Sequence, residues 1–441
     1  MGLPPRFFRR LGFAMEPPRH RPQAWRRAVF VAFVCSCTTG GGGGGGGDTG
    51  TGTQGATVAD TGIASDGGTG IGSATGSGSS GGTGSASGTG GRGDGPDWDA
   101  IKAQAVLEVA LADVFAQPQR RPLATLGWED GVFVSRDGLH LYAFYAPADV
   151  IQFATFFAQN PACPDVTPFL RGPDLGMDLT MNPWGCRNVL HSDIAHATRA
   201  SVDEPFGPWQ RSNIANPYRW DGAFQALDNG DGTQDVVVSV STDQAANDLY
   251  WARGVDHDPP FSAFEPLPPP VNTPGQEDNP HLERLDAGTL VLLWDNDGVD
   301  DPMVEIQYAV SADDGQTWSA PAPLGPTINA GPTTMTGHLV REGADWWLYF
   351  ASDRDGVLSV YRSRHEDSAN IAVAFDAWGP AELVVTPGPA PAGAPGHVVG
   401  VGEPSLSDAG DLSVVVVYVA DEGATEYDRF DADPWVLPRK P

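Results

Sequence analysis

Short apolar runs and turn-forming residues alternate along the chain from residue 98 to residue 441. Five stretches repeat one order: an acidic or small polar residue, a short apolar strand, a glycine-containing turn and a strongly β-prone run. They cover residues 128–146, 220–241, 277–294, 336–352 and 401–419. Apolar residues with a period of two, interrupted by glycine, are typical of paired antiparallel strands. The pattern therefore predicts five hairpins.

Further strands are predicted after the hairpins. Residues 305–311 and 358–363 supply third strands, and residues 209–214, 264–271, 320–328 and 375–385 supply fourth strands. Four-stranded units that repeat around an axis form a β-propeller, in which closure removes free sheet edges. We therefore expect an all-β fold, a five-bladed β-propeller. A sixth blade within residues 147–219 stays open as an alternative.

The two ends of this region are less regular. The last repeat is short after Tyr418, so residues 122–125 or 435–437 are expected to complete its sheet. Residues 99–116 have the apolar spacing of an amphipathic helix, which we expect to pack outside the sheets. The alternative is that this segment is part of the lead-in to the propeller.

The first 37 residues have the order of an export signal. A basic stretch precedes a short apolar run, residues 28–34, which is too short to span a bilayer. The tetrad Val34-Cys35-Ser36-Cys37 resembles a bacterial lipobox, which implies that Cys37 is acylated after cleavage. An ordinary cleaved secretion signal is the alternative. We expect an exported lipoprotein held to the cell envelope, at the outer membrane or the cell surface.

Composition changes sharply after this signal. Residues 38–97 are almost wholly Gly, Ser, Thr, Ala and Asp and cannot bury enough apolar surface to fold. We expect a disordered tether there and a globular domain over residues 98–441. The net charge of the chain is −30, and the globular part carries most of the acidic side chains. Because such a surface repels phosphates and anionic lipid heads, we exclude nucleic acid as a partner and expect membrane contact through the lipid anchor only.

Two cysteines, Cys163 and Cys186, lie within the globular part. In an exported protein such a pair is expected to form a disulfide that closes a surface loop. Two free thiols or a metal pair are the alternatives. The chain has no CxxC spacing that would indicate a structural zinc site.

Carboxylates recur at one position of the predicted innermost strands. Alignment of the repeats places Asp130, Asp221 and Asp278 at equivalent positions in three successive hairpins. In a propeller the first residues of each innermost strand face the central funnel, where ligands bind. Neighbouring residues in this alignment are expected to bind a ligand there, namely Glu129, Glu277, His281, His338 and Glu403.

Two short motifs resemble known propeller repeats. Residues 311–318, SADDGQTW, resemble the Asp-box, a turn found in sialidases and in many propellers that cleave nothing. In such a turn Asp313 caps backbone N–H groups, Gly315 takes a left-handed conformation and Trp318 packs under the hairpin. Residues 403–414, EPSLSDAGDLSV, resemble the repeats of TolB-like propellers.

The three funnel Asp residues resemble the carboxylates of five-bladed arabinanase-type glycosidases. That resemblance implies Asp130 as the base, Asp221 as the partner that tunes the acid, and Asp278 or Glu277 as the acid. The acid of that family is usually Glu, and none of its other motifs is present in the chain. The alternatives are that these Asp residues cap the starts of strands or hold a structural cation.

Sialidase activity is disfavoured, because the chain has no Arg-Ile-Pro element and a single full Asp-box. We expect the funnel to bind a glycan, a peptide or a protein partner, with glycoside hydrolysis as the alternative function. No cofactor and no metal ligands are expected, except that a divalent cation such as calcium on the funnel axis stays open. The chain is expected to be a monomer.

Overall fold

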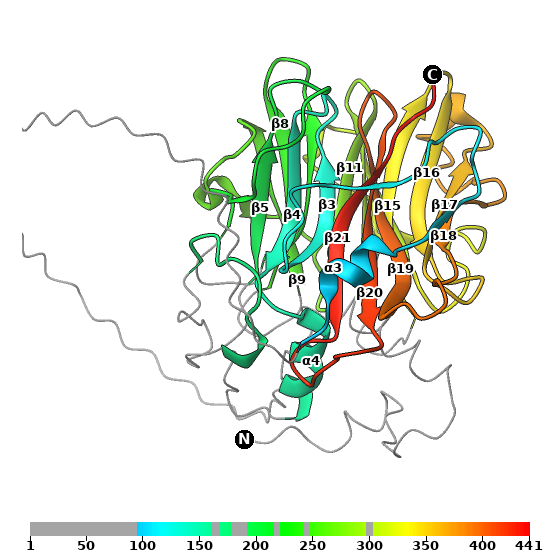
Figure 1. Ribbon diagram of the computed structural model, residues 1–441. Helices are drawn as coiled ribbons and strands as arrows, with labels where there is room; N and C mark the ends of the chain where they lie inside the picture. The colour runs from blue at the N-terminus through cyan, green and yellow to red at the C-terminus, as the bar shows by residue number, and fades with distance from the viewer. Residues whose placement is uncertain (1–94, 160–166, 178–191, 216–220, 242–246, 297–302) are drawn as a thin grey trace, which may run out of the picture. The chain divides into compact units, whose positions relative to one another are not determined.

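The computed structural model describes residues 95–441, apart from residues 160–166, 178–191, 216–220, 242–246 and 297–302 (Figure 1). Antiparallel strands in five sheets dominate this part of the chain. The described helices are α3 (Trp98–Ala103), α4 (Val150–Gln159) and the 3-10 helices η1 (Thr167–Phe169), η2 (Phe261–Ala263) and η3 (Ser368–Asn370). None of the helices in the described ranges is long and apolar enough to cross a membrane.

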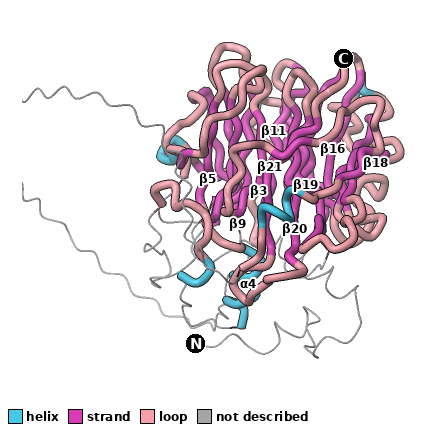
Figure 2. The backbone as a smooth tube through the Cα atoms, in the orientation of Figure 1, coloured by secondary structure: helices cyan, strands magenta, loops and turns pink. Residues whose placement is uncertain are grey.

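Each sheet is one blade of a five-bladed β-propeller. Figure 2 shows its strands in magenta and the loops that connect them in pink. Blade 1 contains β3 (Trp128–Val134), β4 (His140–Ala146), β5 (Asp193–Thr198) and β6 (Gln210–Arg211). Blade 2 contains β7 (Asp221–Asp228), β8 (Gln234–Ser241), β9 (Asn247–Val255) and β10 (Glu265–Pro266). Blade 3 contains β11 (Asp278–Asp286), β12 (Thr289–Asn296), β13 (Glu305–Ser311) and β14 (Ala322–Pro323).

The last two blades follow the same order. Blade 4 contains β15 (Thr334–Glu342), β16 (Asp345–Ser352), β17 (Ser359–Arg364) and β18 (Glu382–Pro387). Blade 5 contains β19 (Gly396–Leu406), β20 (Leu412–Ala420) and β21 (Phe430–Leu437). The first strands of the five blades contact one another in a ring, so they are the innermost strands.

Two short strands that precede blade 1 in the chain join the sheets of the last two blades. β2 (Gln119–Arg120) pairs antiparallel with β21 and completes blade 5. β1 (Leu107–Val109) pairs with β18 and gives blade 4 a fifth strand. Blade 5 therefore contains β19, β20 and β21 from the end of the chain and β2 from before blade 1. A sheet built from both ends of the domain closes the ring of blades.

The prediction of five blades is confirmed, and the described residues contain no sixth sheet. All five predicted hairpins form. The third strand predicted at residues 305–311 coincides with β13, whereas the fourth strands of blades 1, 2 and 3 contain only two residues each. Blade 5 is completed by residues 119–120 rather than by 122–125, while residues 435–437 belong to its third strand.

The helix predicted over residues 99–116 is wrong beyond Ala103. α3 ends there, and residues 107–109 pair with β18 as β1 instead. β-Branched residues fit a half-buried pleated surface, and the free edge of β18 supplies the partner that a helix would lack. Asp97, at the predicted end of the tether, caps α3 by accepting the N–H of Ala100 at 3.0 Å.

The helix α4 was not predicted. Asp149 precedes it, is fully buried, and accepts the N–H of Gln152 in the first turn at 3.0 Å. The same carboxylate accepts the N–H groups of Arg429 and Phe430 at 2.8 and 2.6 Å, which fixes the start of α4 against β21 (Figure 1). Tertiary contacts therefore decide the place of this helix.

The apolar core lies in the wedges between neighbouring blades. β20 is buried along its whole length, because its valine-rich run is covered on both faces by the adjoining sheets. One cluster joins α3, blade 4 and blade 5, including Ile101, Val385 and Val416. The segment around α3 is thus packed as part of the propeller.

The turn between β13 and β14 forms the contacts predicted for residues 311–318. Asp313 accepts the N–H and the hydroxyl of Thr317 at 2.8 and 2.7 Å, and Gly315 has a φ of +81°. Trp318 is buried, with its ring centroid 6.4 Å from that of Trp251 in the neighbouring blade. These contacts stabilise a turn between outer strands and supply no reactive group to the axis.

Several predicted features lie outside the described residues. They are the signal segment 1–37, the tether up to residue 94, the acylated Cys37 and the cysteine pair Cys163 and Cys186.

Candidate functional site

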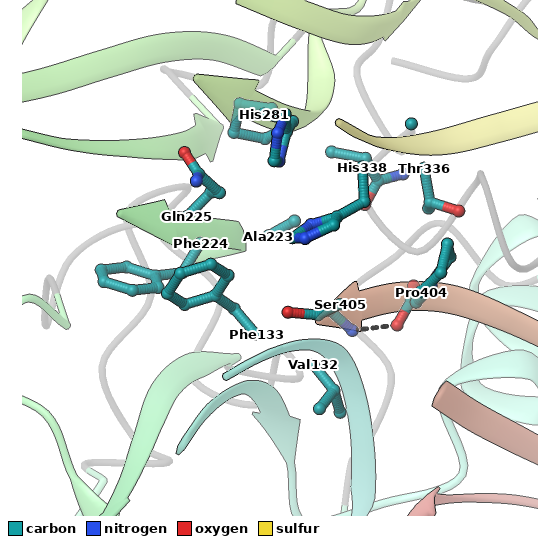
Figure 3. Close-up of a pocket in the computed structure, with 15 residues that line it drawn as sticks. Val132, Phe133, Ala223, Phe224, Gln225, His281, Thr336, His338, Pro404 and Ser405 are labelled. Carbon is teal, nitrogen blue, oxygen red and sulfur yellow. Dashed lines mark hydrogen bonds between the residues drawn. The ribbon is translucent and has the colours of Figure 1, made fainter. Parts of the chain in front are cut away.

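The five innermost strands surround a cavity on the propeller axis (Figure 3). The cavity is small: its volume is about 40 Å³, within about 350 Å³ of space between atoms that includes open solvent. Each strand contributes three lining residues, namely residues 131–133, 223–225, 279–281, 336–338 and 403–405. Glu403 is the one carboxylate among these lining residues.

Every innermost strand bulges beside this cavity. In blade 1 the pairing register shifts between Asp130 and Phe133, and the other four blades shift at the equivalent place. Four bulges contain a left-handed residue, namely Gly131 (φ 57°), Asn279 (49°), Thr336 (56°) and Glu403 (54°). The extra residue of a bulge is left out of the strand ladder, so its N–H needs another acceptor.

Carboxylates accept these N–H groups across the junctions between blades. Glu403 in blade 5 accepts the N–H of Gly131 in blade 1. Asp295 on β12 accepts the N–H of Thr336 in blade 4 through both of its oxygens, at 2.9 and 3.0 Å. Acidic residues near the axis therefore hold neighbouring blades together.

Asp130, Asp221 and Asp278 occupy equivalent positions just before the bulges, as the alignment predicted, and they flank the cavity without lining it. Asp130 is buried and accepts the indole N–H of Trp128 at 2.9 Å and the N–H of Gly131 at 3.0 Å. Asp221 is fully buried. Asp278 is half-buried and accepts the N–H of the next residue at 2.8 Å.

Two carboxyl groups beside Asp130 hold their protons to higher pH than usual. Burial raises the pKa of Glu403 well above its ordinary value, and Asp130 raises it further through its charge and through a hydrogen bond between the two side chains. Burial also raises the pKa of Asp278, and the charge of Asp130 adds to this rise. The structure thus brings Asp130, Asp278 and Glu403 into one electrostatically coupled group.

Glu129 and Glu277 do not line the cavity. Both are fully buried, and each accepts a hydroxyl hydrogen bond from a threonine four residues earlier, Thr125 at 2.6 Å for Glu129 and Thr273 for Glu277. The chain repeats Thr-x-Gly-x-Glu at both places. The two glutamates therefore fix the loops that lead into β3 and β11.

His281 and His338 do line the cavity, and their ring centroids lie 4.4 Å apart (Figure 3). Nε2 of His281 lies 3.0 Å from the backbone nitrogen of Leu339, whose N–H it accepts, and 3.1 Å from the carbonyl oxygen of the same residue. Nε2 of His338 accepts the N–H of Leu406 at 3.1 Å. Burial lowers the pKa of His281 to about 3 and that of His338 well below its ordinary value. Both rings are therefore neutral hydrogen-bond acceptors.

These two histidines belong to a ring of equivalent bonds between blades. Four junctions have a side chain that accepts a backbone N–H of the next blade: Gln225 from Leu282 at 2.9 Å, His281 from Leu339, His338 from Leu406, and Ser405 from Val134 at 3.0 Å. At the junction of blades 1 and 2, Phe133 and Phe224 meet instead, with ring centroids 5.7 Å apart. The cavity lining therefore also closes the propeller.

An ion pair lies beyond the last lining residues. Arg136, which follows β3, reaches Glu283 on β11, and its guanidinium also donates to the carbonyl of Leu339 at 3.4 Å. Burial raises the pKa of Glu283, although the charge of Arg136 opposes the rise. Because the pair joins blade 1 to blade 3 past the lining residues, it crosses the axis at the end of the cavity away from Asp130.

The sequence analysis missed Gln225, Asp295 and Arg136. Gln225 follows the aligned Phe224 directly, so its place beside the cavity could have been inferred from the same alignment. The roles of Asp295 and Arg136 depend on contacts with another blade, for which the sequence carries no local signal.

No family model matches the chain, and no curated protein matches it. Solved structures with a similar fold include the catalytic domain of a family 62 α-L-arabinofuranosidase from Coprinopsis cinerea, at 9% identity and a TM-score of 0.42 over 71% of this chain and 91% of that one. An endo-arabinase from Bacteroides thetaiotaomicron gives 12% identity and a TM-score of 0.40, over 73% and 94%. A thermostable family 43 glycoside hydrolase gives 9% and 0.42, over 73% and 92%. At these values the similarity concerns the propeller fold alone and carries no argument about activity.

Proposed function

We propose that this protein is a cell-envelope lipoprotein, acylated at Cys37, whose propeller binds a glycan, peptide or protein ligand at the axial cavity. The observation that carries the binding role is the state of the carboxylates. Asp130 is held by Trp128, by the N–H of Gly131 and by Glu403, so it is engaged in the fold rather than free to activate water. A cavity with apolar walls and a few polar groups suits recognition of a ligand group.

The net charge of the chain limits the charge that the ligand can carry. With a net charge of −30, the protein repels anionic molecules at long range. Glu403, as the carboxyl group in the lining, offers hydrogen bonds to hydroxyl or amide groups, whereas Nε2 of His281 and of His338 is already engaged by the next blade. A neutral glycan or a neutral or basic peptide segment fits these features.

Glycoside hydrolysis is the second candidate. It is favoured by the raised pKa of Asp278 and of Glu403 beside Asp130, because a glycosidase needs one protonated carboxyl as acid and one carboxylate as base or nucleophile. In this second candidate Asp130 acts as the base, Asp278 as the acid and Asp221 as the partner that tunes the acid.

A panel of neutral glycans and peptides, assayed with the purified chain for binding and for release of reducing sugar, separates the two candidates. Binding without release, lost in Glu403→Gln and kept in the distant Glu342→Gln, supports the binding role. Release that disappears in Asp130→Asn and Asp278→Asn, while both variants keep the wild-type melting curve, establishes the hydrolase instead. Neither binding nor release across the panel overturns both.

A further inference from the structure

Three imidazoles and one carboxylate gather between blades 1 and 2, away from the axial cavity. His140 begins β4, His196 lies on β5, and His257 follows β9 of blade 2. The rings of His140 and His257 stack with centroids 3.9 Å apart, and Nδ1 of His140 lies 3.0 Å from Nε2 of His196. Asp137 lies in the turn before β4. One ligand atom each from Asp137, His140 and His257 lie within 4.8 Å of one another.

The surrounding structure holds this cluster in place. The ring of Tyr142 stacks on His196 with centroids 4.3 Å apart, and its hydroxyl donates to the backbone carbonyl of His257. Asp258, the next residue, accepts the N–H of Asn213 at 3.0 Å and the hydroxyl of Ser212 at 2.5 Å. The loop after β9 is therefore fixed to blade 1, and His257 with it.

Ligand atoms of the cluster are available. Oδ1 of Asp137 accepts from the hydroxyl of Ser135 and the N–H of Leu139, whereas Oδ2 has no hydrogen bond to a described residue. Nδ1 of His257 is buried and has no hydrogen-bond partner in the described part of the chain. His140 uses Nδ1 toward His196, which leaves its Nε2 for another partner.

We propose that Asp137, His140 and His257 bind a divalent transition-metal ion of the zinc type, with water completing the coordination. Two imidazoles and one carboxylate are a donor set that suits zinc and its neighbours in the first transition row. His196 is the positioning residue, because it accepts the N–H at Nδ1 of His140 and so keeps the lone pair on Nε2 for the ion. Since nitrogen lone pairs lie in the ring plane, the stacked rings do not aim at one point. Binding therefore requires one ring to turn, and we assign this movement to His257: its backbone carbonyl is held by Tyr142, whereas Nδ1 of its ring has no hydrogen-bond partner among the described residues.

The ion would join the two blades that lack a polar bond in the axial ring. At this junction Phe133 meets Phe224, whereas side-chain acceptors bridge the other four junctions. Because His257 of blade 2 is far in the sequence from Asp137 and His140 of blade 1, the three ligands assemble only in the folded protein. An ion that binds the folded state selectively raises its stability.

The test uses the purified full chain after removal of metal with a chelator. Co²⁺ is titrated with its visible d–d absorption as readout, Zn²⁺ by calorimetry, and thermal unfolding is recorded with Zn²⁺ and with chelator. His257→Phe keeps an aromatic ring for the stack but removes the ligand nitrogen, and Asp137→Asn keeps an acceptor for Ser135 and Leu139. His397→Phe, at an exposed histidine paired with Asp421, is the matched control.

We expect one equivalent of either ion to bind the wild type and the control, with a higher midpoint of unfolding in Zn²⁺ than in chelator. His257→Phe and Asp137→Asn lose this binding, while His196→Phe weakens it about 10- to 100-fold without abolishing it. The proposal is overturned if the wild type shows no saturable binding of one equivalent. It is equally overturned if both ligand variants bind as tightly as the wild type, since the ion then lies elsewhere.

Discussion

Nε2 of His281 in blade 3 accepts the backbone N–H of Leu339 in blade 4 at 3.0 Å. The same relation recurs one blade further, between His338 and Leu406. A histidine on the innermost strand therefore does what Gln225 and Ser405 do at other junctions, and its first role is to hold one blade to the next. This explains why residues that look like ligands in the sequence are neutral acceptors in the structure.

Replacing His281 by Phe is expected to destabilise the protein. The ring volume is retained, but the buried N–H of Leu339 loses its acceptor, which costs about 1–3 kcal/mol in the free energy of unfolding. Urea unfolding followed by tryptophan fluorescence measures this loss. His397→Phe, at an exposed position, serves as the control and is expected to change stability little; equal stability of both variants would contradict the role assigned to His281.

Glu403 is expected to make stability depend on pH. Because its pKa in the folded protein is raised above the ordinary 4.5, the folded state binds more protons than the unfolded state above that pH. The contribution of this group is fully present below about pH 4.5 and is lost as the pH rises toward its folded pKa. Glu403→Gln cannot titrate, so its free energy of unfolding should fall less steeply than that of the wild type over this range.

Glu342 provides a control, because its pKa is shifted in the opposite direction to that of Glu403. Burial raises its pKa, but hydrogen bonds from Arg439 and Tyr349 outweigh burial and the pKa is lowered. Its contribution is therefore present above about pH 4.5 and lost as the pH falls. Urea unfolding of Glu342→Gln across the same pH series should show a lower free energy of unfolding than the wild type near neutral pH.

For Glu403, the outcome that refutes its raised pKa is a free energy of unfolding that depends on pH in Glu403→Gln in the same way as in the wild type.

The sequence predicts the inner hairpins of this fold because each carries its own signal. In residues 128–146, for example, apolar alternation and a glycine turn fix β3 and β4 locally. β2 contains two residues and carries no pattern of its own, so its pairing with β21 follows only from closure of the ring. Residues 107–109 lie in a stretch whose sequence pattern predicts a helix, and they form a strand because they pair with the edge of β18 in the folded protein.

The candidate site likewise has one part that the sequence predicts and one part that it does not. The alignment predicts that Asp130, Asp221 and Asp278 share one position, because the bulge repeats in every blade. It does not predict that Asp130 meets Glu403, because those residues are far apart in the sequence and approach only when blade 5 closes on blade 1. Hydrogen bonds between blades decide which carboxyl groups are engaged by the fold.

Cys37 is expected to carry the lipid anchor. Metabolic labelling with a radioactive fatty acid should label the wild-type protein in a bacterial host with lipoprotein processing, and Cys37→Ala should abolish the label. Cys35→Ala is the matched control, because Phe33 and Val34 before Cys35 are too large for the usual cleavage site. A wild-type protein that takes up no label would favour the alternative of an ordinary secretion signal, and label that persists in Cys37→Ala would place the lipid on another residue.

Lys102 links α3 to the third strand of blade 5. Its Nζ lies 2.5 Å from Asp431 and 2.9 Å from Asp433, and it also donates to the carbonyl of Thr125 at 3.1 Å. Both aspartates are fully buried, and Lys102 itself is 4% exposed. Burial lowers the pKa of Lys102, but the two carboxylates outweigh this and the pKa is raised, so the amine is charged at neutral pH.

Lys102→Met should therefore be strongly destabilising. The substitution retains most of the side-chain volume but removes one of the two cations beside each aspartate, because Arg171 still pairs with Asp431 at 2.8 Å and Arg120 with Asp433 at 2.5 Å. Removing one partner of a buried ion pair costs about 3–5 kcal/mol when the other charge is left unpaired, so we expect a loss near the lower end, about 3 kcal/mol. Lys440→Met, at an exposed lysine that bonds only to the carbonyl of Ala112, is the control and should unfold like the wild type. If Lys102→Met and Lys440→Met unfold at the same temperature, the contacts of Lys102 do not stabilise the propeller. If Lys102→Met alone melts early, the segment before blade 1 is required to hold the ring closed.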